Sequence, residues 1–245
     1  MVTLQNILDR TRSIIDEPSG TAGFWTDDEL TNWVNDACRD VARRAEDLIS
    51  FNTSITCVAG TYLYALPADV IRVHRAEFVP TGQTQVYPLQ ASTYDDMDAI
   101  WGVNQQIQSS YPGWFVVRGF PGGTQVSTAD GRLMIQLYPV PAVAATLNLF
   151  YYRLPYRFTS GSGGELAKEV EVPAGWDDLV VTFTAYKAFV KNRDDRWKDL
   201  RQTYDQDILY LIDVSRRFHD QAAQFTTGSP YTGVGYGVML GGFDW

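Results

Sequence analysis

The chain has 245 residues, with 29 acidic and 20 basic side chains and a formal net charge of −9. This balance argues against a protein that binds nucleic acid by neutralising phosphates, and the length suffices for one large domain or two modest ones. The two cysteines, Cys38 and Cys57, lack the spacing of a metal site or a disulfide framework, which favours buried thiols in a reducing compartment. With no signal-peptide pattern and no apolar run near the ~20 residues of a membrane span, we expect a protein made in the cytoplasm without a membrane partner.

Two amphipathic helices are predicted before residue 50. The first falls within residues 3–16, where Thr3 can cap it and an apolar face recurs at helical spacing. The second follows a Pro/Gly break, with Thr26 as N-cap and Glu29, three residues later, completing a capping box. The apolar stripe of this second helix comprises Leu30, Trp33, Val34, Ala37, Val41, Ala45 and Leu48.

From residue 51 the apolar period changes to two, which is typical of strands. The predicted strands are 51–58, 60–67, 70–79, 87–90, 114–120, 132–141 and 146–158, separated by Pro/Gly turns. Between the fourth and fifth, residues 92–101 predict a short helix capped by Ser92 or Thr93.

Two further helices are predicted near the end. Residues 173–192 carry β-branched side chains that favour a strand, but their length and the spacing of Leu179, Phe183 and Val190 favour a helix. Residues 195–219 predict a long amphipathic helix whose apolar residues recur at helical spacing, beginning with Trp197.

The order of elements predicts an α+β protein in which a discontinuous helical bundle carries an inserted β-rich domain and an extended C-terminal tail. Each terminal helix pair exposes an apolar stripe, and the simplest solution packs the two pairs against each other. We therefore expect a bundle from 1–50 and 173–222, a β insertion at 51–172 and a docking extension at 223–245. The predicted bundle core is Leu30, Trp33, Val34, Val41, Leu179, Phe183, Trp197, Leu200, Tyr204 and Ile208.

The sequence has no set of residues with the spacing of a known catalytic site. His74 and His219 have no nucleophile motif beside them, and the acidic cluster at 95–98 lacks the glycine and distal glutamate of an EF-hand loop. The glycine-rich stretches do not end in the Gly-Lys-Ser/Thr of a phosphate loop. Glycosidases use a pair of carboxylates, but no sequence pattern singles out two of the acidic residues of this chain for that role. We predict no enzyme, no metal and no cofactor.

The chain resembles the head-to-tail connector, or adaptor, proteins of tailed bacteriophages. The resemblance rests on the runs FWTDDELTNWVNDACRDVARRAEDL, YALPADVIRVHRAEF, YPLQASTYDDMDAIW, GRLMIQLYPVPAVAATLNLFYYRLP and VEVPAGWDDLVVTFTAYKAF, in this order. It implies a virion neck protein that forms a ring with identical subunits, commonly twelve, beneath the portal protein. It also implies contacts with tail or nozzle proteins, with fibres as a further candidate. Genomic DNA would pass through the channel without specific binding.

The last residues, 228–245, combine glycines with large apolar side chains, unlike an ordinary polar terminus. The resemblance implies an extension that reaches into crevices between portal subunits, and the predicted docking residues are Tyr231, Tyr236, Met239, Leu240, Phe243 and Trp245. A tail folded on its own domain is the alternative. Alternative functions are another tail-assembly ring (a terminator or nozzle), a fibre-, receptor- or sugar-binding protein, and a wall hydrolase.

Overall fold

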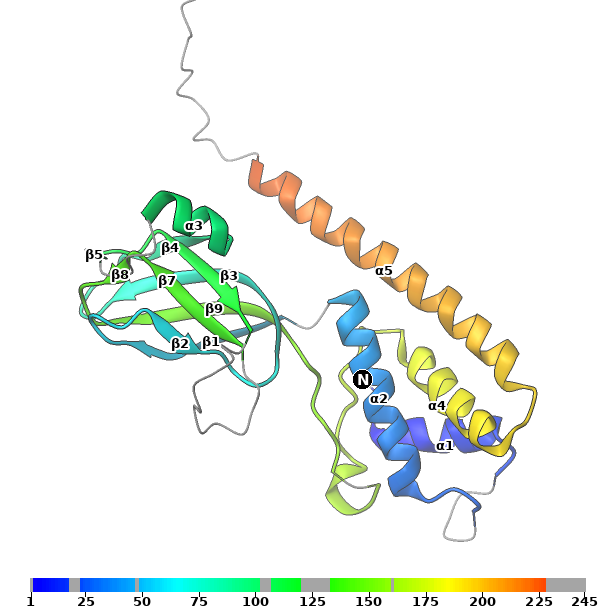
Figure 1. Ribbon diagram of the computed structural model, residues 1–245. Helices are drawn as coiled ribbons and strands as arrows, with labels where there is room; N and C mark the ends of the chain where they lie inside the picture. Colours follow the sequence, from blue (N-terminus) through cyan, green and yellow to red (C-terminus); the bar gives the residue numbers. More distant parts are fainter. Residues whose placement is uncertain are drawn as a thin grey trace, which may run out of the picture.

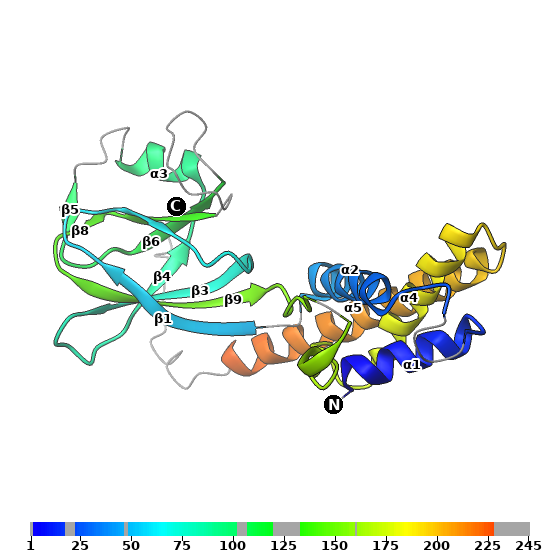
Figure 2. The same cartoon turned by 90° about the horizontal axis from the view of Figure 1, so that it is seen from below.

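The computed structural model describes residues 2–17, 23–46, 49–101, 107–119, 133–159 and 161–227, with only the backbone at 49–54, 101 and 218–227. Within these ranges the protein is a mixed α+β structure of helices and a large sheet. Four helices gather at one end and the sheet lies at the other, as Figures 1 and 2 show from two directions.

The first two helices begin at the predicted caps. α1 (Leu4–Ile14) starts after Thr3, whose hydroxyl accepts from the Asn6 N–H at 3.4 Å. α2 (Asp27–Ala45) starts after Thr26, whose hydroxyl accepts from the Glu29 N–H at 3.2 Å. The Glu29 carboxylate pairs with Lys191, so the glutamate of the predicted capping box also ties two helices together.

A buried arginine joins α1 to the start of α2. The Arg12 guanidinium donates to the Glu17 carboxylate at 2.8 Å and to the Trp25 carbonyl at 3.0 Å, and its side chain is only 4% exposed. A buried charge is tolerated when it is paired and hydrogen-bonded. This pairing fixes the path of the chain into α2.

The sheet has the strand order β1-β9-β3-β4-β6-β7-β2. Its strands are β1 (Ile49–Cys57), β2 (Leu63–Ala65), β3 (Val70–Pro80), β4 (Tyr87–Ala91), β6 (Trp114–Arg118), β7 (Met134–Tyr138) and β9 (Ala145–Arg153). All neighbouring pairs are antiparallel except β4 and β6, which are joined by α3 (Tyr94–Trp101). β5 (Gln108–Ser109) and β8 (Val140–Pro141) form a small separate ladder.

The sheet builds its own apolar core. Along β9 the side chains alternate, so that Leu147 and Leu149 are fully buried. They pack with Phe78 from β3 and with Ile135 and Leu137 from β7. This alternation is the period-two pattern of the sequence.

The helices pack through α4 (Asp177–Asn192), which contacts α1, α2 and α5 (Trp197–Thr227). The sequence predicts that the two terminal helix pairs pack against each other. In the structure, Leu30 and Val34 of α2 lie in a cluster with residues of α1 and α4, while Val41 packs with Tyr204 of α5. The stripe of α2 is therefore shared between two sets of partners along its length.

The chain returns from the sheet to the helices through residues 154–158. The sequence predicts a strand through Phe158, but the ladder of β9 ends at Arg153. Beyond it the backbone bonds to α2: the Asn35 amide donates to the Phe158 carbonyl and accepts from its N–H, both at 2.9 Å. Farther on, a Cβ on Gly161 would meet the Asp27 backbone at 2.4 Å, so this close approach requires glycine.

α5 continues past the helices that support it. It spans 31 residues, and its last turns extend beyond α2 and α4 (Figure 1). The sequence pattern predicts its end near residue 219, eight residues too early.

Candidate interaction surfaces

The structure describes the side chains of His74 and of the carboxylates on α3, but not that of His219. His74 is exposed on β3, and its ring lies 5.7 Å from that of Tyr152. The carboxylates of Asp95 and Asp98 are exposed on α3. No group of three or more His, Cys, Asp or Glu residues in the described ranges could hold a metal ion. None of the described helices is both long and apolar enough to span a membrane.

Both thiols are buried and free, as their sequence context suggested. Burial raises the pKa of Cys38 to about 12 and the pKa of Cys57 to about 11. A thiol held in its protonated form is a poor nucleophile. Neither cysteine is therefore poised for covalent chemistry.

A buried tyrosine links α2 to α5. The Tyr204 hydroxyl donates to the Asp40 carboxylate at 2.6 Å, and its ring packs edge-on against Phe183 at 5.1 Å. Burial, with the carboxylate as a second cause, raises the pKa of Tyr204 well above its usual value. Asp40, outside the apolar stripe of α2, thus takes part in a helix–helix contact.

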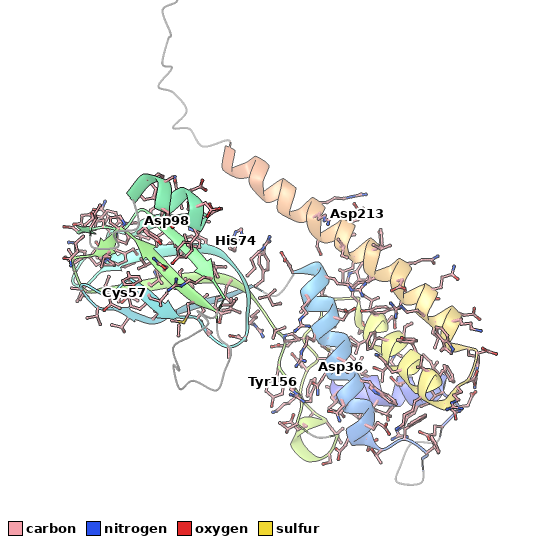
Figure 3. The ribbon with its side chains drawn as sticks, viewed as in Figure 1. Asp36, Cys57, His74, Asp98, Tyr156 and Asp213 are labelled. Carbon is pink, nitrogen blue, oxygen red and sulfur yellow. The ribbon has the colours of Figure 1, made fainter. Side chains whose placement is uncertain are left out.

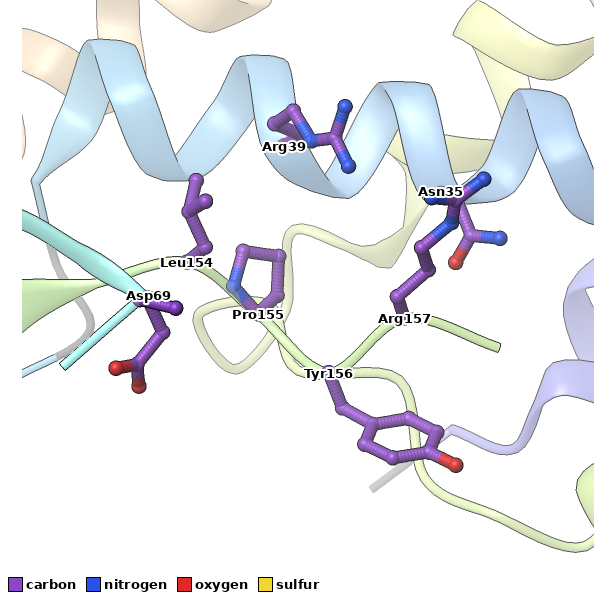
Figure 4. A pocket seen from close by; sticks show the side chains of 8 residues that line it. Asn35, Arg39, Asp69, Leu154, Pro155, Tyr156 and Arg157 are labelled. Atoms are coloured by element: carbon purple, nitrogen blue, oxygen red, sulfur yellow. The ribbon is translucent and has the colours of Figure 1, made fainter. Parts of the chain in front are cut away.

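A pocket of about 460 Å³ lies where the sheet joins the helices (Figure 4). α2 contributes two side chains, the turn before β3 contributes two residues, and the segment after β9 contributes four. The lining residues are Asn35, Arg39, Ala68, Asp69, Leu154, Pro155, Tyr156 and Arg157. The pocket therefore depends on the junction between elements that are far apart in the sequence.

Two guanidinium groups line this pocket without a counterion among the residues that the structure describes. Arg39 is half-buried and Arg157 is exposed, and neither makes an ion pair or hydrogen bond with a described residue. Asp69 is the one carboxylate in the lining; it accepts from the Tyr151 hydroxyl at 3.4 Å and points away from Arg39 and Arg157 in Figure 4. The side of the pocket next to α2 is therefore electropositive.

The outer face of α5 exposes large apolar side chains. Leu209 is 65% exposed and Tyr210 is 62% exposed, and the ring of Trp176 lies 5.5 Å from that of Tyr210. A second apolar region lies at the end of the sheet, where Tyr87 stacks on Tyr111 at 4.2 Å. Contiguous exposed apolar groups of this kind mark surfaces for protein partners.

The sequence profile of the SU10 adaptor protein family matches residues 2–228. The chain belongs to the SU10 adaptor protein family. The match begins before α1 and ends just after α5, so it includes every helix and strand of the described residues. This is a phage adaptor family, which confirms the resemblance to phage adaptors and indicates a structural, tail-related role in the virion. The family is not a class of enzymes. No curated protein matches the chain.

In this member of the SU10 adaptor family, eight of the ten residues predicted for a helical core lie in two adjoining clusters, and Trp197 and Leu200 lie in neither. Six are buried: Leu30, Val34, Val41, Leu179, Tyr204 and Ile208. Four are half-buried: Trp33, Phe183, Trp197 and Leu200. Phe183 contacts both clusters, and the ring of Trp197 lies 6.4 Å from that of Tyr186. The six predicted docking residues between Tyr231 and Trp245 lie outside the described residues.

The sequence pattern does not single out the pocket residues of the adaptor. Arg39 lies outside the apolar stripe of its helix, and Arg157 falls within the strand predicted at 146–158. Asn35 adjoins the apolar stripe of α2 and is 6% exposed. A buried asparagine beside such a stripe is the one signal that could have pointed to a tertiary contact, because a buried amide needs partners.

Proposed function

We propose that this protein is a head-to-tail adaptor that forms a ring beneath the portal and joins it to the tail. The family match over residues 2–228 carries the proposal, because it spans the helices and the sheet together. In this proposal the ring sits in the virion neck, contains twelve copies, and lets DNA pass through its channel. The protein is made in the host cytoplasm and assembles there.

A ring needs two different surfaces on each subunit, one for each neighbour. We propose that a helical bundle of residues 1–50 and 173–222 forms the ring and that residues 51–172 face outward or toward the tail. The exposed pair Leu209 and Tyr210 on α5 supports this assignment, since the face would be covered by a second copy. The net charge of −9 also suits a lumen that does not hold DNA by phosphate neutralisation.

The segment 223–245 is proposed to dock on the portal. Its aromatic residues on a glycine-rich backbone suit insertion between subunits, and Phe243 and Trp245 are the proposed anchors. Many tails binding one portal ring would gain avidity. Docking also requires the segment to lose conformational freedom, so several apolar contacts are needed.

The test mixes the purified chain with the portal protein of the same phage and follows the complex by electron microscopy. The expected result is a ring of adaptor copies on the portal. Deleting residues 228–245 should abolish portal binding while the helical signal and melting temperature stay nearly unchanged. Replacing Phe243 and Trp245 together by Ala should weaken binding by about 2–4 kcal/mol. Replacing Ser229 and Thr232 by Ala is the matched control.

Two results would contradict the proposal. A chain that ignores the portal but binds tail-tube or fibre proteins would indicate a terminator, a nozzle or a fibre-attachment protein. A tail that resists protease equally with and without portal would indicate that it folds on its own chain rather than on the portal.

A further inference from the structure

The pocket at the junction has the chemistry of a carboxylate receptor. A guanidinium offers five N–H donors in a planar fork that matches a carboxylate. Arg39 and Arg157 line one pocket and have no acceptor among the described residues. Leu154 and Pro155 add an apolar wall beside the two charges. An incoming group should therefore carry acidic side chains next to an apolar one.

Helix α3 presents this combination on another part of the surface. Its first five residues include three aspartates, and the helix has no basic residue. Asp95 and Asp98 are exposed without an ion pair among the described residues, and Ile100 is 59% exposed. The helix is held firmly on the sheet, because Met97 is 1% exposed and packs with Val116 of β6.

We propose that this pocket receives the acidic helix α3 of a second copy of the chain. The inference rests on the proposed ring and adds a second contact between neighbouring subunits to the one that the helical bundle makes. Asp95 and Asp98 would pair with Arg39 and Arg157, and Ile100 would lie against the apolar wall.

The contact must form between chains. Figure 3 shows Asp98, on helix α3 at the sheet end of the molecule, well separated from Tyr156 and Asp36, so one chain cannot bring its own α3 into its own pocket. The pocket and α3 are different surfaces, and a contact between different surfaces is the kind that closes into a ring. Each subunit would supply a pocket to one neighbour and a helix to the other.

Carboxylates fit this pocket better than a nucleic-acid backbone does. Arginine also binds phosphate, but a DNA strand brings a continuous row of negative charges. Asp36, one turn before Arg39, is exposed on the same helix, and Asp69 is part of the pocket lining. Asp36 and Asp69 would repel a row of phosphates. A short helix brings only a few carboxylates, and these can approach the arginines without approaching Asp36 or Asp69.

The test uses reversal of charge in the full chain. Variant A carries Arg39→Glu and Arg157→Glu, and variant B carries Asp95→Arg and Asp98→Arg. Each variant alone sets like charges against each other and should require about tenfold more protein to assemble than the wild type. An equimolar mixture should assemble again, because each pocket then meets an α3 of opposite charge. Assembly is read as mass by analytical ultracentrifugation and as adaptor copies bound per portal ring.

Single changes control for folding and for added charge. Arg39→Glu should impair assembly, whereas Gln83→Glu should not, because Gln83 is exposed in the turn between β3 and β4, away from the pocket, α3 and the helices. The melting temperature of every variant is measured. If variant A does not fold, Arg39→Gln and Arg157→Gln replace it and should still impair assembly.

The outcomes separate this inference from the proposed function. Normal assembly of variant A on the portal would overturn the inference and leave the adaptor role standing. A mixture that fails to restore assembly would also overturn it. If variant A assembles normally but loses affinity for DNA, the pocket binds phosphate and the inference is wrong. A wild-type chain that stays monomeric at every concentration and beside the portal would overturn both.

Discussion

Replacing Asn35 tests how strongly the returning chain is fastened to α2. The side-chain amide forms two hydrogen bonds of 2.9 Å with the backbone of Phe158, and both residues are buried. Asn35→Ala leaves a buried N–H and a buried carbonyl without partners, each at a cost of about 1–3 kcal/mol. We therefore expect the free energy of unfolding to fall by about 2–6 kcal/mol. Urea titration followed by tryptophan fluorescence and far-UV circular dichroism measures this loss.

The variant Asn35→Asp adds a dependence on pH. An ionised carboxylate can accept from the Phe158 N–H but has no proton for the Phe158 carbonyl, whereas the protonated carboxyl has both a donor and an acceptor. Burial and the facing carbonyl raise the folded-state pKa of the introduced carboxyl above its unfolded value. Its stabilising contribution is therefore present at low pH and lost as pH rises through the folded pKa.

The free energy of unfolding of Asn35→Asp should thus be furthest below that of the wild type at neutral pH, and the difference should shrink on acidification. The deficit of Asn35→Ala, which has no titrating group, should stay constant. An Ala variant that loses less than about 1 kcal/mol would refute the reasoning about buried partners. An Asp variant whose deficit is the same at roughly pH 7 and roughly pH 5 would refute the reasoning about the proton.

Three further predictions follow from buried or paired groups. Tyr204→Phe should cost about 1–2 kcal/mol through the lost bond to Asp40, and Tyr204→Ala about 3–5 kcal/mol through the added cavity; equal urea midpoints for the two variants would contradict the buried ring. Because burial raises its pKa to about 12, Cys38 should react with a thiol reagent at mildly alkaline pH only on unfolding; rapid labelling of the native protein would show that it is accessible. The hydrogen bond from Arg153 lowers the pKa of Glu171 in the folded protein. The ionised Glu171 therefore stabilises the fold above the ordinary glutamate pKa, and this stabilisation is lost as pH falls through the folded-state pKa. The stability of Glu171→Gln should match the wild type in acid and fall below it at neutral pH, and an equal acid sensitivity of both proteins in calorimetry would contradict this.

The starts of the helices could be predicted because caps are local. Thr3, Thr26 and Thr93 each accept a hydrogen bond from an N–H three residues later, and this geometry follows from short sequence spacing alone. The ends were harder to predict. β9 ends at Arg153, two residues before Pro155, which has no N–H to donate to a strand ladder. The bonds that Asn35 then makes with the backbone of Phe158 join residues far apart in the sequence, and no local pattern predicts them.

The candidate interaction surfaces depend even more on contacts between residues that are far apart in the sequence. Arg39 and Arg157 face one pocket only because residues 154–158 lie along α2. The assignment to phage adaptors rested on the resemblance to that family. The residue patterns by themselves indicated only that the sequence has no catalytic motif. The two-residue β5 was missed because a segment that short has no periodicity to detect.

The points where the chain enters and leaves the sheet have an evolutionary consequence. It enters in β1 and leaves in β9, which are hydrogen-bonded neighbours with Ile49 opposite Tyr152. The two crossings are therefore separated by about one strand spacing, ~5 Å. Where entry and exit are this close, a whole segment can be exchanged for another of similar span without moving the helices that hold it. Such an exchange point would let related chains keep one set of helices while the segment between β1 and β9 varies, and it offers a defined site for grafting a foreign segment.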